Sequence, residues 1–166
     1  MRVLATEPRI LQRMSMRIRR YRDSDQEEVW ALHNVALKDV GAHAGNGPWD
    51  DDLHHVRDVY LEKSGEFLVG TLVGRIVAMG ALKHLTTSHA EIKRMRVPPV
   101  HQRRGFGQAI LDALEARAAE LGYSTLQLDT TVQQTAAQKL YIKNGYVEEE
   151  RTMSGEFNVI KYVKAL

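Results

Sequence analysis

A strand that ends in two prolines and leads into a glycine-bounded helix is the feature that most restricts how this chain can fold. Residues 90–97 (AEIKRMRV) read as a strand, and Pro98 and Pro99 follow them. Because proline donates no backbone hydrogen bond, the strand is expected to end there. From Gly105 the apolar period becomes helical, which predicts a helix that closes at Gly122. Its apolar face consists of Phe106, Ile110, Leu111, Leu114, Ala118 and Leu121.

Apolar periodicity on either side of this unit predicts a series of strands and helices. The expected strands are residues 16–20, 67–72, 75–82, 90–97, 125–130, 146–151 and 157–163. The expected helices are residues 25–38, about 53–60, 105–121 and one from residue 136 that closes at Asn144 and Gly145. Strands and helices alternate in the second half, and a hairpin supplies the middle. The order predicts an α/β fold with a mixed central sheet of about seven strands flanked by about four helices.

Length and composition indicate one globular domain. The 166 residues, with 43% hydrophobic and 27% charged side chains, suit a single domain over residues 16–166 preceded by a tail over residues 1–15. The tail lacks the apolar core of a secretory signal, and no apolar run approaches the roughly 20 residues that span a bilayer. The chain has no cysteine, which excludes disulfides and thiolate chemistry. A cytoplasmic location without membrane attachment is expected.

Basic residues gather around the turn before the glycine-bounded helix. Residues 102–107 read QRRGFG and follow a basic strand end, residues 93–96 (KRMR), although the whole chain carries a net charge of only +2. At a helix start, Gly105 and Gly107 permit close approach of a ligand, while open N–H groups and the helix dipole attract anions. This pattern favours a site for the phosphates of a nucleotide-derived cofactor, and a solvated basic turn is the alternative. The spacings of a P-loop and of a dinucleotide-binding fold are absent.

Three segments in register resemble the GNAT superfamily of acetyl-CoA-dependent N-acetyltransferases. Residues 102–107 match its [QR]xxGx[GA] motif, the VPP of residues 97–99 lies at the family's spacing, and residues 136–146 (AAQKLYIKNGY) resemble its AxxLYxxxGF signature. The resemblance extends over residues 16–163 and is specific over residues 90–146. It implies a GNAT-like fold, acetyl-CoA as cosubstrate and an amine as acceptor.

The resemblance also implies which residues bind the cofactor. The backbone of residues 95–97 would pair with the pantetheine arm as an added strand does, and residues 102–108 would hold the pyrophosphate. This strand and the next would splay apart around the thioester, with an irregularity near Arg96 and Val97. Gln134 stands where the family often has Asn. The implied cofactor-binding residues are Met95, Arg96, Val97, Gln102, Arg103, Arg104, Gly105, Phe106, Gly107, Gln108 and Gln134.

Two residues match the family's catalytic positions. Glu91 would be the general base for the acceptor amine, and its period-two spacing from Met95 and Val97 predicts that the three share one sheet face. An exposed strand glutamate paired with Lys93 or Arg94 is the alternative. Tyr141 would be the general acid for the leaving thiolate, with a core tyrosine as its alternative.

Other charged residues support weaker expectations. The seven histidines show no metal-ligand spacing, so no metal is expected. The acidic run of residues 50–52 beside Trp49 could attract a cationic amine or simply start a helix.

An acyl-CoA-binding regulatory module without turnover is the second hypothesis for the function, and a nucleic-acid-binding protein ranks third because interleaved aromatics are missing. A homodimer that pairs residues 157–163 is possible.

Overall fold

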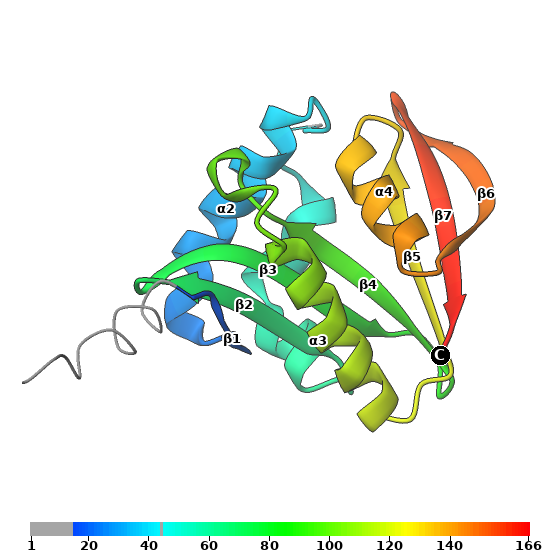
Figure 1. Ribbon diagram of the computed structural model, residues 1–166, viewed down its shortest axis with the longest axis horizontal. Helices are drawn as coiled ribbons and strands as arrows, with labels where there is room; N and C mark the ends of the chain where they lie inside the picture. Colours follow the sequence, from blue (N-terminus) through cyan, green and yellow to red (C-terminus); the bar gives the residue numbers. More distant parts are fainter. Residues whose placement is uncertain (1–14, 44) are drawn as a thin grey trace, which may run out of the picture.

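One mixed sheet organises the molecule. The structure is a computed structural model that describes residues 15–43 and 45–166. Its sheet has seven strands in the order β1-β2-β3-β4-β5-β7-β6 (Figure 1). The strands are β1 (Arg17–Arg20), β2 (Glu66–Leu72), β3 (Arg75–His84), β4 (His89–Arg96), β5 (Thr125–Thr131), β6 (Val147–Ser154) and β7 (Phe157–Ala165). The predicted seven-stranded α/β architecture is confirmed, and the tail expected over residues 1–15 lies, apart from Ser15, outside the described residues.

Helices cover both faces of the sheet. The α-helices are α2 (Gln26–Asp39), α3 (Phe106–Glu120) and α4 (Thr135–Lys143), and the short helices are η1 (Asp23–Asp25), η2 (Pro48–His54), η3 (Arg57–Leu61) and η4 (Pro99–His101). Figure 1 shows α3 and α4 crossing the front of the sheet. Within the described residues, no helix is both long enough and apolar enough to span a bilayer.

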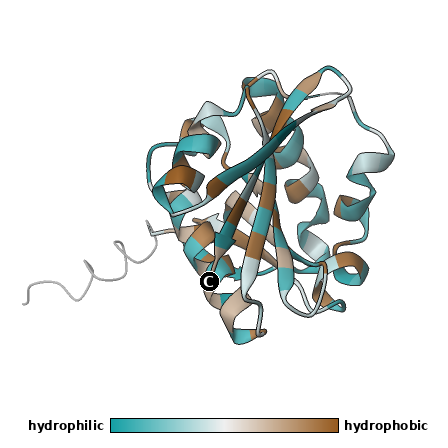
Figure 2. Ribbon diagram, turned by 90° about the vertical axis from the view of Figure 1, so that its right-hand side faces the viewer, coloured by the Kyte–Doolittle hydropathy of each residue, from teal (hydrophilic) through white to brown (hydrophobic). Residues whose placement is uncertain are grey.

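Two apolar cores lie on opposite faces of the sheet, and alternate strand residues belong to each. On β3, Met79 and Ala81 pack with Val29 of α2, whereas Ala78 and Leu82 pack into the core that contains α3 and α4. Because consecutive strand residues point to opposite faces, this alternation places α2 on one side of the sheet and α3 and α4 on the other. Figure 2 shows the corresponding bands of apolar and polar residues along the strands.

Helix α3 forms where its period predicts it. Ile110, Leu111 and Leu114 have no exposed surface and fill the core on this face of the sheet. Gly105 begins the helix at φ +78° and Gly122 follows its end at φ +87°, and both values favour glycine.

The helix expected over residues 53–60 is the element that differs most from its prediction. A 3₁₀-helix, η2, and a π-turn, η3, replace it, and His55 separates them at φ −137° and ψ 42°. The apolar stripe is still buried, since Leu53 and Tyr60 have no exposed surface. The acidic side chains in η2 bind residues of α2 and β4, as described below, so tertiary contacts here outweigh regular helix geometry.

Candidate active site

Strands β4 and β5 separate part-way along their length. They pair in parallel over residues 89–91 and 125–127, after which β4 continues only against β3 and β5 only against β7. The edge of β4 that faces β5 therefore has no strand partner from Ile92 onward. Unpaired backbone groups at such an edge can bind an extended ligand as they would bind a strand.

A β-bulge lies in β4 beside this opening. Lys93 pairs with Ala81 and Arg96 pairs with Met79, so β4 holds one residue more than β3 between these two pairs. Arg94 has φ +57°, a value unusual for a residue other than glycine, and marks the bulge. The irregularity expected from the sequence is present, two residues before Arg96.

The bulge reverses which side chains of β4 share a face. Glu91, Lys93 and Arg96 lie opposite alternate residues of β3 and therefore point to the face covered by α2. Met95 packs instead into the core beside α3. The expectation that Glu91 and Met95 share a face is wrong, because the extra residue shifts the period of two by one.

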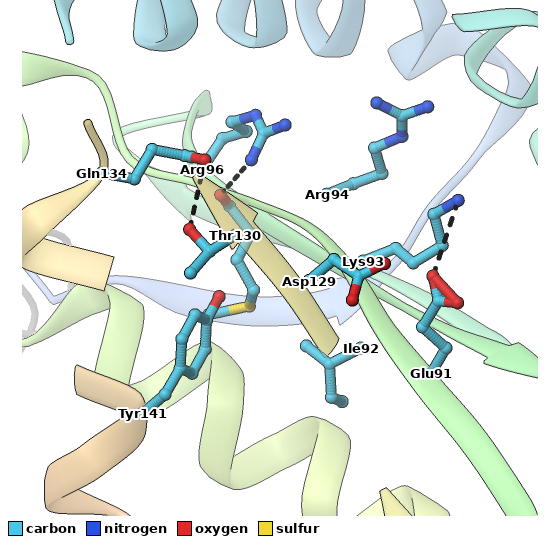
Figure 3. A pocket seen from close by; sticks show the side chains of 10 residues that line it. Glu91, Ile92, Lys93, Arg94, Arg96, Asp129, Thr130, Gln134 and Tyr141 are labelled. Atoms are coloured by element: carbon cyan, nitrogen blue, oxygen red, sulfur yellow. Dashed lines mark hydrogen bonds and ion pairs between the residues drawn. The ribbon is translucent and has the colours of Figure 1, made fainter. Parts of the chain in front are cut away.

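A cavity of about 200 Å³ occupies the opening between the strands. Figure 3 shows the side chains of β4, β5 and α4 that surround it. Its volume is below the roughly 300 to 1,000 Å³ of sites for drug-sized ligands, so it suits the reacting ends of two substrates. Five of the residues predicted from the sequence line this cavity: Glu91, Met95, Arg96, Gln134 and Tyr141.

Glu91 is a partly desolvated carboxylate in the cavity wall. Its side chain is 17% exposed, and its Oε1 lies 3.7 Å from the Lys93 Nζ. Burial raises the pKa of Glu91, Asp129 adds to this rise, and Lys93 opposes it. The pairing with Lys93 that the sequence offered as an alternative is present, and a carboxylate of raised pKa is also a better proton acceptor.

Tyr141 brings a phenol to the same cavity from α4. The residue is 4% exposed, and its ring packs edge-on against that of Tyr146 at 5.7 Å. Burial raises the pKa of Tyr141 to about 12 although Arg96 opposes the shift, so the phenol stays protonated at neutral pH. The hydroxyl has no hydrogen bond to any described residue, which leaves its proton available to a ligand in the cavity.

The N-terminus of α3 presents open backbone amides. Its N-cap, Gly105, provides no side-chain cap, and the first helical hydrogen bond runs from the Ala109 N–H to the Gly105 carbonyl at 3.0 Å. The N–H groups of Phe106, Gly107 and Gln108 precede that bond and have no acceptor in the helix. They are suited to hold the phosphates of a cofactor.

The side chains around this helix start have distinct roles. Arg103 and Arg104 are exposed, and the Arg104 guanidinium lies 5.9 Å from the centre of the Phe106 ring. The Gln102 Nε2 donates to the Val97 carbonyl at 3.1 Å and so ties the turn to the end of β4. The two arginines remain free to meet phosphates, whereas Gln102 holds the shape of the turn.

Two predicted cofactor-binding glutamines use their side chains within the protein. The Gln108 amide exchanges two hydrogen bonds of 2.8 Å with the Asn144 amide. The Gln134 Oε1 accepts from the Thr130 hydroxyl and the Thr131 N–H, each at 3.2 Å, and so caps the turn into α4. A cofactor could therefore meet the backbone of Gln108 and the amide nitrogen of Gln134.

A buried charge network on the α2 side of the cavity was missed from the sequence. Arg94 donates to the two Asp52 carboxylate oxygens at 2.5 and 2.9 Å, and Tyr60 donates to the same carboxylate. The His33 Nε2 lies 3.0 Å from the Asp50 Oδ1. The acidic run beside Trp49 was the only signal of this network, because its partners are distant in sequence.

This network fixes the charge states of its members. Burial and the neighbouring Arg96 and Arg94 lower the pKa of His33 to about 4, although Asp50 opposes the shift, so His33 is neutral at pH 7. Burial alone would raise the pKa of Asp52, but its bonds with Arg94 and Tyr60 outweigh burial and lower it. In the described part of the chain, no three His, Asp or Glu side chains are grouped to hold a metal ion.

Comparison with known proteins defines the class to which this fold and site belong. The chain belongs to the acetyltransferase (GNAT) family, whose model matches residues 19–146. It is 37% identical over 73 residues to the uncharacterized N-acetyltransferase YsnE of Bacillus subtilis (strain 168), a match that covers 43% of this chain and 48% of that protein. The matches to this relative and to the uncharacterized N-acetyltransferase YedL of Escherichia coli (strain K12) span about half the length of those proteins.

Solved structures share the fold. An acetyltransferase of the GNAT family from Staphylococcus aureus Mu50 superposes with a TM-score of 0.84 at 21% identity, covering 91% of this chain and 99% of that one. The PaiA N-acetyltransferase of Thermoplasma acidophilum, solved in complex with coenzyme A, superposes with a TM-score of 0.71 at 19% identity, covering 89% and 98%. At these identities the likeness establishes the architecture.

Proposed function

We propose that this protein transfers the acetyl group of acetyl-CoA to a primary amine of a small molecule, a peptide or a protein. The observation that carries the proposal is the opening between β4 and β5, where Glu91 and Tyr141 line one cavity. Family membership supports the reaction class. The coenzyme A complex of the related Thermoplasma fold supports acetyl-CoA as the cosubstrate.

In this proposal, backbone groups hold most of the cosubstrate. Residues 95–97 pair with the pantetheine arm along the open edge of β4, and the amides at the start of α3 bind the pyrophosphate. Arg103 and Arg104 neutralise phosphate charge from the surface, and the free amide nitrogen of Gln134 reaches the arm.

The acceptor amine must lose a proton before it attacks. An amine with a pKa of about 10.4 is free base in roughly 1 molecule in 10³ at neutral pH, which corresponds to about 4 to 5 kcal/mol. Glu91 takes this proton, directly or through water, and its raised pKa favours that role. The nitrogen then forms a bond to the acetyl carbon and, now positively charged, releases a second proton to solvent, while open N–H groups of β4 stabilise the oxyanion of the tetrahedral intermediate.

Collapse of the intermediate breaks the C–S bond and leaves a thiolate that needs a proton. Tyr141 occupies the position expected for the general acid and donates a hydrogen bond to this sulfur. A thiol has a pKa of about 8.5, so complete transfer from a phenol of pKa about 12 is uphill by roughly 5 kcal/mol. Tyr141 is therefore expected to stabilise the thiolate chiefly by its hydrogen bond, with the net proton coming from solvent after release.

A titration and an assay together test the proposal. Calorimetry with acetyl-CoA should show binding to one site, and a thiol-release assay over a panel of amines should show release that depends on the amine. Binding without release on any amine would favour the alternative of a regulatory acyl-CoA-binding module. Absence of acetyl-CoA binding would contradict both.

Two further expectations from the sequence belong to this proposal. The strand expected to pair in a homodimer, residues 157–163, lies in β7 between β5 and β6 and has no free edge. A homodimer would instead form through β6, an edge strand whose residues are all exposed. Sedimentation analysis of the full chain would distinguish a monomer from a dimer. The cytoplasmic location stays a prediction that localisation of the tagged chain would test.

A further inference from the structure

The cavity contains a cation without a counter-ion. Three basic residues of β4 line it, and two of them have acidic partners: Lys93 lies 3.7 Å from Glu91, and Arg94 is 2.5 Å from Asp52. Arg96 has no carboxylate within 4.0 Å among the described residues. The guanidinium of Arg96 therefore differs from its two neighbours in being uncompensated.

The hydrogen bonds of Arg96 leave most of its donors unused. Its Nη1 donates to the Met95 carbonyl at 2.8 Å, and this is its one side-chain hydrogen bond to the described residues. Its Nε is out of contact with solvent and has no partner. A guanidinium carries five N–H donors in a planar fork that matches two oxygens of one oxyanion. An unpaired buried donor is unfavourable, so a ligand that accepts from Arg96 gains free energy by binding there.

The surroundings keep this charge in place but do not neutralise it. Burial and the nearby Arg94 lower the pKa of Arg96 to about 10, so it remains a cation at neutral pH. Asp50 and Asp52 attract it from a distance, yet Arg94 and His33 already bind these carboxylates. An anion entering the cavity would relieve the repulsion between the two arginines.

The anion is not expected to come from acetyl-CoA. Its charged groups are phosphates, which the proposed cofactor site places at the start of α3, whereas its pantetheine arm and thioester are neutral. The bulge turns the side chain of Arg96 to the face of Glu91 and α2, away from the face on which Met95 packs beside α3. Figure 3 shows the Arg96 guanidinium at the cavity near the bulge. The acceptor is the remaining source of charge.

We infer that the acceptor is an amine that also carries a carboxylate, and that Arg96 binds this carboxylate and so selects the acceptor. This inference rests on the proposed acetyl transfer and narrows its substrate to amino acids or short peptides with a free carboxylate. The Arg96 backbone keeps its place along the cosubstrate, so replacement of its side chain should affect carboxylate-bearing acceptors more than acetyl-CoA.

Matched acceptors test the inference. Thiol release from acetyl-CoA would be measured for α-amino acids, ω-amino acids of increasing length and dipeptides, each beside its carboxamide and beside an aminoalkyl phosphate of similar length. Rates would be corrected for the fraction of free amine. The protein variants would be wild type, Arg96→Gln, Arg96→Lys, and Arg75→Gln as an exposed arginine control at the start of β3.

Wild type and Arg75→Gln should prefer acids to their carboxamides. Arg96→Gln should lower kcat/KM for the acids about 10- to 100-fold more than it lowers kcat/KM for the carboxamides. Arg96→Lys should restore part of the preference. The ω-amino acid length with the highest rate would report the distance between Arg96 and the transfer site.

Equal wild-type rates on acids and carboxamides would overturn the inference while leaving the acetyltransferase proposal intact. A preference for the phosphates would overturn the carboxylate assignment. An equal loss of kcat/KM on acids and carboxamides in Arg96→Gln would show that Arg96 has a structural role. Absence of turnover on every amine would reject the proposed function and this inference with it.

Discussion

The proposed cofactor side and the proposed acceptor side of the cavity are built in different ways. The cofactor side uses neighbouring segments of one stretch, the open edge of β4 and the start of α3, and it offers mostly backbone groups. The acceptor side uses side chains from α2, η2 and β4, and polar groups such as Asp50 and His33 are almost fully buried in it. The first depends on local conformation, whereas the second depends on the tertiary structure.

This difference separates the groups that bind a ligand from the groups that stabilise the fold. Open amides at a helix start can hold a ligand without contributing to the core. A buried ion pair is strongly coupled to folding, since removing one partner leaves an uncompensated charge. We therefore expect substitutions on the cofactor side to change binding with small effects on stability, and substitutions in the acceptor-side network to change stability as well as rate.

Glu91→Gln is expected to have the largest effect on catalysis. Loss of the base should lower kcat/KM by about 10²- to 10⁴-fold. Because burial raises the pKa of Glu91 above the ordinary 4.5, wild-type activity should fall as pH falls through that raised pKa, and the variant should lack this ascending limb. Glu62→Gln, on an exposed glutamate, should behave as wild type. An unchanged pH profile in Glu91→Gln would place the base elsewhere.

Asp52→Asn tests whether the acceptor-side network stabilises the fold. Loss of the carboxylate leaves Arg94 buried without its partner and should lower the free energy of unfolding by about 3 to 5 kcal/mol. Urea denaturation would measure the change. Asp23→Asn breaks an exposed pair with Arg57 and should cost less than about 1 kcal/mol.

The Asp52 carboxylate also predicts how the stability of the fold depends on pH. The pKa of Asp52 is lower in the folded state than the ordinary 3.8, so its contribution is complete above that value and is lost as pH falls through the folded pKa. As pH falls, the free energy of unfolding should decrease less steeply in Asp52→Asn than in wild type. Equal pH slopes would show that the pair does not stabilise the fold.

Tyr141→Phe should affect rate with little change in stability. The hydroxyl has no bond to a described residue, so its removal should lower kcat about 10- to 100-fold through the lost interaction with the sulfur. Tyr146→Phe is the matched control, because the Tyr146 hydroxyl donates to Glu115 at 2.9 Å. That variant should lose about 1 to 3 kcal/mol of stability and keep its kcat. A stable Tyr141→Phe with wild-type kcat would exclude the phenol from the reaction.

Gly105→Ala should have the smallest effect, and only on the cofactor side. A Cβ at φ +78° strains the turn by about 1 to 2 kcal/mol and shifts the open amides. Acetyl-CoA affinity should fall about tenfold, the equivalent of one weakened hydrogen bond to phosphate. Gly122→Ala carries similar strain at φ +87° at the other end of α3 and should leave the affinity unchanged in calorimetry. Equal affinities in the two variants would contradict the assigned phosphate site.

The sequence predicts the fold and the backbone conformation at the start of α3 well for a physical reason. The strand ending at Pro98 and the helix starting at Phe106 follow from local period and from backbone constraints within a few residues. The family resemblance predicted an irregularity near Arg96 and Val97, but the apolar period could not place the bulge at Arg94, because one extra residue in a polar stretch leaves no trace in that period. The pairs of Asp52 with Arg94 and of Asp50 with His33 depend on contacts between residues 17 to 42 positions apart. Their charges are visible in the sequence, but their proximity is not.

The central claim is that acetyl-CoA binds along the open edge of β4 and at the start of α3. Amide hydrogen exchange with and without acetyl-CoA tests it most directly, because both regions are defined by backbone N–H groups without partners. We predict slower exchange on binding at residues 92–97 and 106–108 and unchanged exchange in β1 and β6. Protection elsewhere, with these two segments unaffected, would contradict the claim.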